Sequence, residues 1–399
     1  MRTLTVVAAF DFLPEPRTVG ELQRDSIPGR GDRYRFNFDP GWLSGNWTQP
    51  LDNVTALAPS VFSRNLDFPF IIDSIPDRWG RTLIERRHSR MLRKAGQAVR
   101  TCTTWDFLVG VDDRTRMGAL RFFDEAGKAV SESPDSVPPL SQLASFSTLL
   151  RDYEENGVEA FWLDAFFSSS SSLGGARPKI NVVDDDGTLW IAKLPALHDT
   201  YDVGLWEELV MRLARRAGIH TAQTMTIPGH DGRHVLLSRR FDRDGDSRIH
   251  MASAHCLLYP RTEDASFLDL AELVSMCSVA PQDDLHELFR RLVFFASVNN
   301  TDNHLRNHAF LLTQDGWRLA PAYDINASVH GRASALAITE GLHELDMSLI
   351  KSLSPLFAQD NADEVVDSVL DAVSFWKQEA RELGLGHEIP LMETAFAVG

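Results

Sequence analysis

The sequence of 399 residues contains only three cysteines, scattered as Cys102, Cys256 and Cys277. Their number is odd and no C-x-x-C pair occurs, so the sequence favours neither a disulfide framework nor a zinc site built from cysteine thiolates. Basic residues are also in deficit, since 40 Lys and Arg face 56 Asp and Glu and give a formal net charge of −16. Such a surface repels nucleic acid unless a local basic patch overrides it. We therefore expect any DNA contact to be weak on its own or to come through a basic partner.

Long apolar runs are absent as well. No segment approaches the roughly 20 apolar residues that a membrane-spanning helix needs. The apolar start of the chain, residues 1–10, is too short for a signal peptide and is broken by Asp11 and Pro14. We interpret it as a first strand, and the sequence predicts a cytoplasmic protein without membrane contact.

The length and the 43% hydrophobic content are sufficient for two or three packed units. We expect an N-terminal subdomain over residues 1–125, with strands over 3–12, 19–22, 34–38 and 117–123 and a helix over 73–94. A stretch rich in Glu, Ser, Asp and Pro predicts a linker over 126–145. The rest of the chain divides into a mixed region at 146–245 and a helical region at 246–399.

The mixed region has a recognisable order of elements. A serine- and glycine-rich loop precedes a hairpin with strands over 180–183 and 188–194, whose turn has Asp-Gly chemistry. A helix over 205–217 follows, and Gly218 suits its end. Two more strands are expected over 221–227 and 234–241. Loop, two strands, helix and two strands is the order of a protein-kinase N-terminal lobe.

Helices dominate after residue 246. Apolar residues recur at helical spacing over 268–277, 283–298, 345–353 and 362–383. One hairpin, with strands over 308–313 and 316–320, interrupts them. The expected fold class is therefore α+β, a protein-kinase-like two-lobed fold with a mixed β N-lobe, an all-α C-lobe and a small N-terminal α/β subdomain.

The most informative spacing in the chain links Asp302, Asn307 and Asp324. Asn307 follows Asp302 by five positions, and Asp324 lies just beyond the predicted hairpin. Protein-kinase catalytic loops place a catalytic Asp, a metal-binding Asn and a metal-binding Asp in this order. One carboxylate accepts the proton of the attacking hydroxyl, while the amide and the other carboxylate hold magnesium on the ATP phosphates. The alternative is a polar turn, because a single D-x-x-x-x-N is common.

The loop from Ser172 to Lys179 is a candidate phosphate-binding element. Its adjacent glycines, Gly174 and Gly175, let backbone N–H groups approach phosphate oxygens. The loop matches neither the P-loop nor the kinase G-x-G-x-x-G pattern, so a flexible surface loop is the alternative. Lys193, late in the second hairpin strand, is a candidate for holding the α- and β-phosphates. Its alternative is an edge-strand lysine.

Two further pairs of residues invite an interpretation. His304 and His308 lie four apart, but this spacing binds a metal only on a helix, and the second histidine falls at the entry to a predicted strand. We therefore expect loop or nucleotide contacts rather than zinc. Glu207 and Glu208 open a predicted helix, where they are candidates for pairing with Lys193 or for favourable charge at a helix N-terminus.

Together these motifs resemble the HipA family of serine/threonine kinases, the toxins of bacterial toxin–antitoxin pairs. The resemblance covers nearly the whole chain, and residues 1–123 resemble the family's small N-terminal subdomain. Five motifs follow the family's order, namely the phosphate loop at 172–179, the ATP-lysine strand at 191–195, the hinge strand at 239–243, the catalytic loop at 301–307 and the metal-binding element at 320–324.

The resemblance implies roles for individual residues. Asp302 would be the catalytic base, and Asn307 and Asp324 would bind magnesium. Ser172 matches the position that family members phosphorylate on themselves, which expels the loop and silences the kinase; the two preceding serines are alternatives. The ATP site would be lined by Gly174, Gly175, Ala176, Lys179, Lys193, Arg239, Phe241, His304, Asn307, Tyr323 and Asp324.

The resemblance also implies cofactors and partners. These are ATP and Mg²⁺, a HipB-like helix-turn-helix antitoxin that alone contacts operator DNA, and a protein substrate such as an aminoacyl-tRNA synthetase, in the family glutamyl-tRNA synthetase. One departure is Arg239, which stands where the family commonly has Glu. Recognition of adenine by main-chain atoms tolerates that change. Two other functions stay open, a catalytically silent nucleotide-binding co-repressor and a small-molecule kinase.

Overall fold

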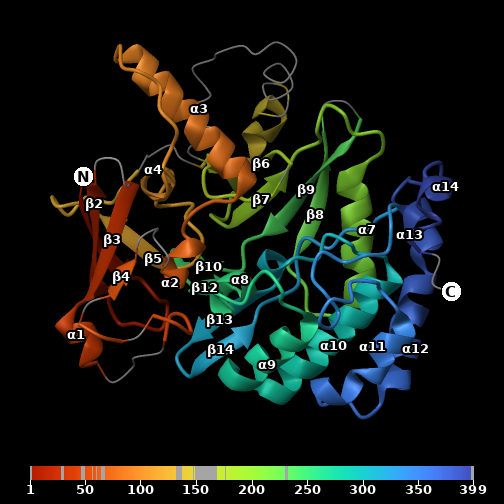
Figure 1. The fold of residues 1–399 in the computed structure, drawn as a ribbon. Coiled ribbons are helices and arrows are strands. Elements are labelled where there is room, and N and C mark those ends of the chain that lie inside the picture. The colour runs from red at the N-terminus through yellow and green to blue at the C-terminus, as the bar shows by residue number, and fades with distance from the viewer. Residues whose placement is uncertain are drawn as a thin grey trace. The chain divides into compact units, whose positions relative to one another are not determined.

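The computed structural model describes residues 2–27, 31–45, 50–55, 57–59, 61–63, 68–131, 137–146, 148, 169–175, 177–229 and 232–396. They form two compact units, whose elements are labelled in Figure 1. Unit 1 comprises Met1–Ala196 with Asp242–Ala252, and unit 2 comprises Leu197–Phe241 with Ser253–Gly399. Each unit combines helices with antiparallel strand pairs, as the α+β class requires. Within the described part of the chain, no helix has the length and apolar character needed to cross a membrane.

A five-stranded antiparallel sheet forms one part of unit 1. Side chains alternate along its strands, so Leu4, Val6 and Ala8 of the first strand are fully buried. Phenylalanine rings pack within the same unit, with Phe36 edge-on to Phe70 at 5.1 Å between ring centroids. The strands are β1 (Thr3–Ala8), β2 (Arg17–Ile27), β3 (Gly31–Phe38), β4 (Val61–Ser63) and β5 (Leu120–Phe123), in the order β4-β3-β2-β1-β5.

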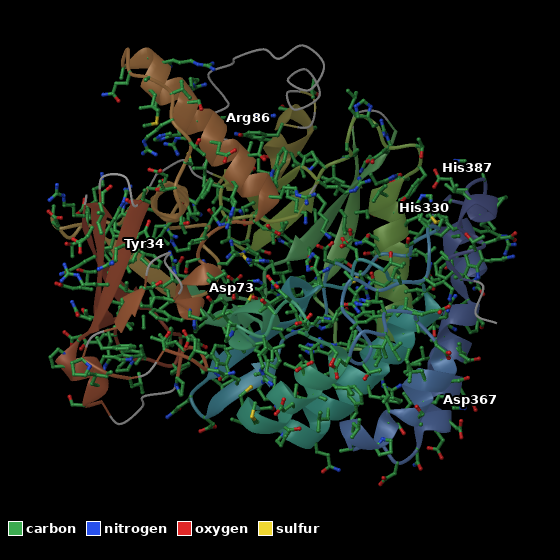
Figure 2. All side chains as sticks on the ribbon, viewed as in Figure 1. Tyr34, Asp73, Arg86, His330, Asp367 and His387 are labelled. Carbon is green, nitrogen blue, oxygen red and sulfur yellow. The ribbon has the colours of Figure 1, made fainter. Side chains whose placement is uncertain are left out.

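The helices of unit 1 connect this sheet to a hairpin. They are α1 (Pro40–Leu43), α2 (Pro69–Ile72), α3 (Arg78–Lys94) and α4 (Thr104–Gly110). The helix expected over 73–94 begins only at Arg78, because Pro76 disfavours helical backbone in the residue before it. Figure 2 shows the side chains along α3, with Arg86 labelled. The hairpin is formed by β6 (Lys179–Val183) and β7 (Leu189–Lys193) and confirms the expected strands.

The stretch expected as a linker is attached to both sheets of unit 1. Val130 donates its N–H to Phe122 of β5, and Val183 of β6 donates to the carbonyl of Pro138, at 2.9 and 3.0 Å. Val130 and Val137 are buried. The short strands β10 (Arg243–Asp244) and β11 (Ser247–Arg248) also belong to this unit, and β12 (Met251–Ser253) lies at its border with unit 2.

Unit 2 is mainly helical. Its central helix α10 buries Leu288, Phe289 and Leu292, and α9 and α12 contact it. The helix expected over 362–383 is wrong as a single element, since the chain breaks into two helices at Phe375. Its elements are α7 (Val203–Arg216), β8 (Thr224–Pro228), β9 (His234–Arg239), α8 (Ala254–Leu257), α9 (Phe267–Cys277), α10 (Pro281–Ser297), β13 (Ala309–Thr313), β14 (Gly316–Leu319), α11 (Met347–Ser352), α12 (Ala362–Ser374), α13 (Trp376–Glu382) and α14 (Ile389–Met392).

Candidate active site

The loop predicted to be catalytic, residues 301–307 and called the catalytic loop below, follows the end of α10 in unit 2. Asn299 turns the chain there with a left-handed backbone, φ +51°, which Asn tolerates better than most residues. Its side-chain amide donates to the carbonyls of Ser328 and Gly331 at 2.7 and 2.8 Å. These two bonds fix the direction in which the loop leaves the helix.

A buried histidine supports the catalytic loop through a hydrogen bond to Asn303. His308 donates from Nε2 to Oδ1 of Asn303 at 2.9 Å and stands edge-on to Phe267 at 5.4 Å. Burial, helped by the charge of Arg291, lowers the pKa of His308 to about 3, so the ring is neutral and can act as this donor. His304 and His308 belong to no cluster of potential metal ligands among the described residues.

The structure brings Asp302 and Asn307 together. Asn307 donates from Nδ2 to the backbone carbonyl of Asp302 at 2.8 Å. The nitrogen of the amide is thereby used within the loop, and the oxygen is the end that suits a cation. The side chain of Asp302 is exposed, whereas Asn303 next to it is buried. A carboxylate on a braced loop and open to solvent can reach a hydroxyl of an incoming molecule.

Tyr323 ties the second acidic element to the catalytic loop. Its hydroxyl donates to the carbonyl of Arg306 at 2.6 Å, and its ring lies 5.4 Å from that of Phe241. Asp324 follows with a left-handed backbone, φ +55°, and its Oδ1 accepts a bond from Asn326 at 3.3 Å. Arg239 ends β9 and is exposed. The proposed catalytic loop and metal-binding element thus belong to unit 2, as do Arg239 and Phe241 of the expected hinge strand.

The Ser–Gly loop, residues 169–175 of unit 1, is held by hydrogen bonds from Asp112, Asn181, Trp79 and Gly80. These four residues are called its seat below. Ser171 accepts a bond on Oγ from the N–H of Asp112 at 3.1 Å, and Asn181 donates to Oγ of Ser172 at 3.2 Å. The four described serines are at most 6% exposed. These serines are therefore buried, whereas Gly174 and Gly175 of the predicted phosphate loop are half-buried.

The first residues of α3 also bind the Ser–Gly loop. Trp79 donates its N–H to the carbonyl of Gly175, and Gly80 donates to that of Leu173, both at 3.0 Å. A Cβ on Gly80 would lie 2.6 Å from the carbonyl oxygen of Ser171, so only glycine permits this approach. Sequence reasoning placed Trp79 and Gly80 in the N-terminal subdomain and missed this role. Ala176 lies outside the described residues.

Two lysines face each other across the hairpin of unit 1. Lys179 and Lys193 are direct partners in the β6–β7 register, so their side chains leave the same face of the sheet. Like charges directly opposite destabilise a strand pair unless an anion lies between them. A Cβ on Gly175, whose φ is +82°, would lie 2.6 Å from Nζ of Lys179, so the ammonium group also touches the Ser–Gly loop. This arrangement suits a phosphate group.

The glutamates proposed as lysine partners have different surroundings. Glu208 binds Arg212 at 2.9 Å and Arg215 at 3.1 Å, and it accepts a 2.5 Å bond from the hydroxyl of Thr224. All three partners lie in unit 2 and include two of the helix's own arginines. The structure therefore uses Glu208 to join α7 to β8, and no such set of contacts identifies it as a partner of Lys193.

Comparison with known proteins establishes the family. The HipA-like C-terminal domain matches residues 171–376, which is slightly more than half of the chain. The chain therefore belongs to the HipA family, and the resemblance drawn from its motifs is confirmed.

Two relatives extend the match beyond that domain. A protein of Sinorhizobium fredii that bears the name "Putative kinase Y4mE" is 26% identical over 412 residues, covering 94% of this chain and 85% of its own length. The solved structure of HipA from Shewanella oneidensis MR-1, in a complex with HipB and operator DNA, matches with a TM-score of 0.66. It is 18% identical and covers 96% of this chain and 91% of the other, so the two share a fold.

Proposed function

We propose that the chain is an ATP- and magnesium-dependent serine/threonine protein kinase of the HipA type. The observation that carries this proposal is the bonded pair of Asp302 and Asn307, tied through Arg306 and Tyr323 to the element that ends in Asp324. The carboxylate of Asp324 and the amide oxygen of Asn307 are oxygen ligands of the kind that magnesium binds together with substrate phosphates. The relative named as a kinase and the shared HipA fold support the same activity.

Polar atoms of the loop favour a nucleotide ligand. Nδ1 of His304 and Nδ2 of Asn303 are buried, and neither has a hydrogen-bond partner among the described residues. Buried polar atoms are nearly always paired, so an orphaned pair beside a proposed active site points to a bound molecule. In unit 1, Lys179 and Lys193 leave the same face of the hairpin, which is compatible with binding of a phosphate group.

The proposed roles of the individual residues are as follows. Asp302 accepts the proton of the attacking serine or threonine hydroxyl. Asn307 and Asp324 hold magnesium, which neutralises charge on the transferring phosphoryl group. Lys179 and Lys193 neutralise the remaining phosphate charge, and the main chain near Arg239 and Phe241 binds the adenine.

Regulation and partners follow from the same proposal. Autophosphorylation in the Ser–Gly loop, at Ser172 or a neighbouring serine, places a group of nearly two negative charges in a buried seat and releases the loop. A HipB-like antitoxin is proposed as the partner, by analogy with the Shewanella complex that contains HipB and operator DNA. The substrate is proposed to be a translation protein such as glutamyl-tRNA synthetase.

Peptide mapping after incubation with ATP and magnesium tests the activity. Phosphate should appear on the peptide of residues 168–179 in the native chain, and Asp302→Asn should remove it without loss of folding, since Asp302 is exposed. The starting protein is first shown by intact mass to be unmodified. No phosphate gain, on this chain or on added protein substrates, would contradict a protein kinase. Rapid phosphorylation of an amine or sugar would instead identify a small-molecule kinase, and operator binding without turnover a co-repressor.

A further inference from the structure

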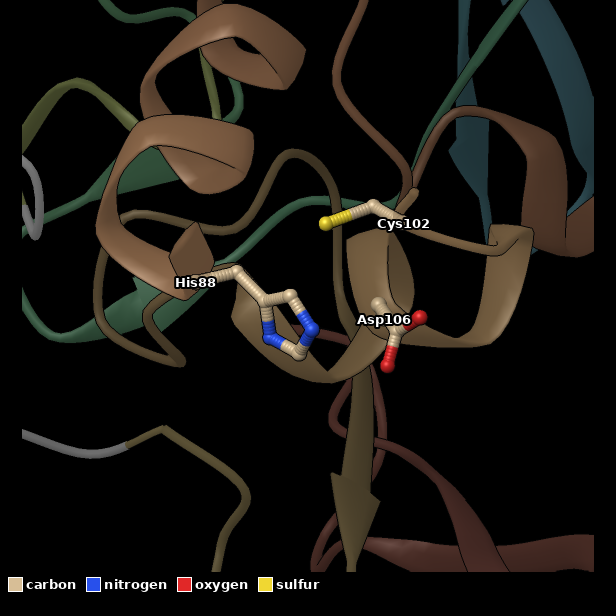
Figure 3. Close-up of side chains that lie close together, drawn as sticks. All are labelled: His88, Cys102 and Asp106. Carbon is tan, nitrogen blue, oxygen red and sulfur yellow. The ribbon is translucent and has the colours of Figure 1, made fainter. Parts of the chain in front are cut away.

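Three potential metal ligands meet in unit 1, far along the chain from the Ser–Gly loop. His88 comes from α3, Cys102 from the segment before α4, and Asp106 from the first turn of α4. One ligand atom from each lies within 4.8 Å of the other two. Figure 3 shows the three side chains close together, His88 on α3, Asp106 on α4 and Cys102 on the segment that precedes α4. They are the only such group among the residues that the structure describes.

The donor atoms have the softness that zinc prefers. An imidazole nitrogen, a sulfur and a carboxylate oxygen suit Zn²⁺ and its close relatives rather than Mg²⁺ or Ca²⁺, which bind oxygen alone. Zinc bonds of about 2.0–2.3 Å place tetrahedral ligand atoms roughly 3.3–3.8 Å apart. The observed limit of 4.8 Å is therefore about 1 Å too wide, a distance that rotation of the three half-buried side chains can close.

Two of the ligands are prepared for a cation. Nε2 of His88 is buried and has no hydrogen-bond partner among the described residues, which is uncommon for a ring nitrogen. Asp106 accepts hydrogen bonds from the guanidinium of Arg100 and from Thr103, so its carboxylate already binds a cationic group.

Arg100 is the competitor for such an ion. Its guanidinium binds both carboxylate oxygens of Asp106, at 2.6 and 2.8 Å. Oδ2 of Asp106 is also bound by the N–H and hydroxyl of Thr103, which close the capping box of α4. Oδ1 accepts only from Arg100 among the bonds described. Since the Arg100 side chain is 48% exposed, it can move into solvent and yield Oδ1 to a metal.

We propose that His88, Cys102 and Asp106 form a binding site for Zn²⁺ or a similar transition-metal ion, with solvent at the fourth position and Arg100 as the group that the ion displaces. The ligands are 14 and 4 residues apart, on α3, on the segment before α4 and on α4, so they form no cysteine motif that the sequence reveals.

The position of the site suggests what the ion would do. It joins α3 to α4, and these are the elements that form the seat of the Ser–Gly loop. Trp79 and Gly80 at the start of α3 bind that loop, and Asp112, just after α4, binds Ser171. A metal that clamps the two helices would stiffen this seat. This consequence rests on the proposed function of the loop, whereas metal binding itself does not.

Cobalt titration of the full chain, with excess magnesium present to fill oxygen-only sites, tests the proposal. One Co²⁺ per chain should produce a thiolate-to-cobalt charge-transfer band in the near ultraviolet, and added Zn²⁺ should abolish it. Cys102→Ser should remove the band. His88→Gln should weaken cobalt binding by more than about tenfold, the loss that even supporting residues of metal sites cause.

Two further variants separate this site from incidental binding. Cys277→Ser is the matched control and should leave the band unchanged. Arg100→Gln should bind cobalt several-fold more tightly, because the competing cation is gone; a purely structural salt bridge predicts no gain. Absence of the band at saturating cobalt, or its persistence in Cys102→Ser, would overturn the proposal. Both results are independent of kinase activity, and circular dichroism establishes that each variant is folded.

Discussion

The Ser–Gly loop of unit 1 and the catalytic loop of unit 2 are both short and polar, yet they are held by different contacts. In the Ser–Gly loop the reactive groups are hidden, since Ser171 is 1% exposed and Ser172 is 6% exposed. In the catalytic loop the reactive group is open, since Asp302 is exposed while its neighbour Asn303 is buried. The serine hydroxyls of the Ser–Gly loop are therefore shielded from solvent, whereas the carboxylate of Asp302 is accessible to solvent.

The hydrogen bonds of the two loops explain which loop we expect to change its position. The catalytic loop rests on a buried network in which His308 holds Asn303, and Asn299 holds Ser328 and Gly331. The Ser–Gly loop rests on single neutral bonds from backbone N–H groups and from Asn181, each worth about 1 kcal/mol. One added charge can outweigh several such bonds. We therefore expect a rigid catalytic loop and a switchable phosphate loop.

The largest expected effect comes from removing charge beside the rigid loop. Asp324→Asn keeps a residue that tolerates the left-handed backbone but loses a magnesium ligand. Phosphoryl transfer should fall at least about 100-fold, because charge stabilisation by a bound metal is worth several kcal/mol. Transfer from labelled ATP over a series of magnesium concentrations measures it. Asp315→Asn, in the exposed β13–β14 turn, is the control; equal activity of Asp324→Asn and this control would remove Asp324 from the site.

The next effect should appear only in the switchable loop. Ser171→Asp places a charge in a position that is 1% exposed, at a desolvation cost of several kcal/mol. The loop should leave its seat, so that limited proteolysis cuts within residues 169–179 and ATP binding weakens. Ser352→Asp, at an exposed helix position, should do neither. A protected loop in Ser171→Asp would show that the seat tolerates charge and that phosphorylation there is no switch.

Acid should loosen both units through buried histidines. Burial lowers the pKa of His250 in unit 1 and of His308 in unit 2 to about 3, from an unfolded value near 6.5. The unfolded chain then binds more protons, so stability is full above about pH 6.5 and falls by roughly 1.4 kcal/mol per pH unit and histidine as the pH drops toward 3.

Urea unfolding between pH 7 and pH 4 measures that slope. His250→Phe, which keeps a ring stacked on Phe10, should lower the slope of stability against pH by the contribution of one histidine, about 1.4 kcal/mol per pH unit. His387→Phe, whose side chain is 77% exposed and labelled in Figure 2, should leave it unchanged. An unaltered slope in His250→Phe would mean that its ring is protonated in the folded protein.

Local patterns predicted most elements but not their contacts. The short apolar start of the chain predicted β1, and the apolar spacing with Gly218 as a left-handed end predicted α7. The break at Phe375 carries neither glycine nor proline, so a continuous helix was the only interpretation available. The five-residue spacing located Asp302 and Asn307. The bond between Asn303 and His308 depends on how α9 packs, and no local pattern contains that information.

The smallest expected effect is on the KM for ATP. It comes from removing the hydrogen bond by which Tyr323, next to Asp324, binds the catalytic loop. Tyr323→Phe removes one 2.6 Å bond to the carbonyl of Arg306 but keeps the ring beside Phe241. Loss of a hydrogen bond of this kind costs about 1 kcal/mol, so we expect a rise in the KM for ATP of roughly fivefold with kcat nearly unchanged. Tyr201→Phe, elsewhere in unit 2, is the control. A large fall in kcat would instead mean that this bond positions Asp324 for the transfer itself, and the proposed catalytic loop would then be more sensitive to the loss of one hydrogen bond than its buried network suggests.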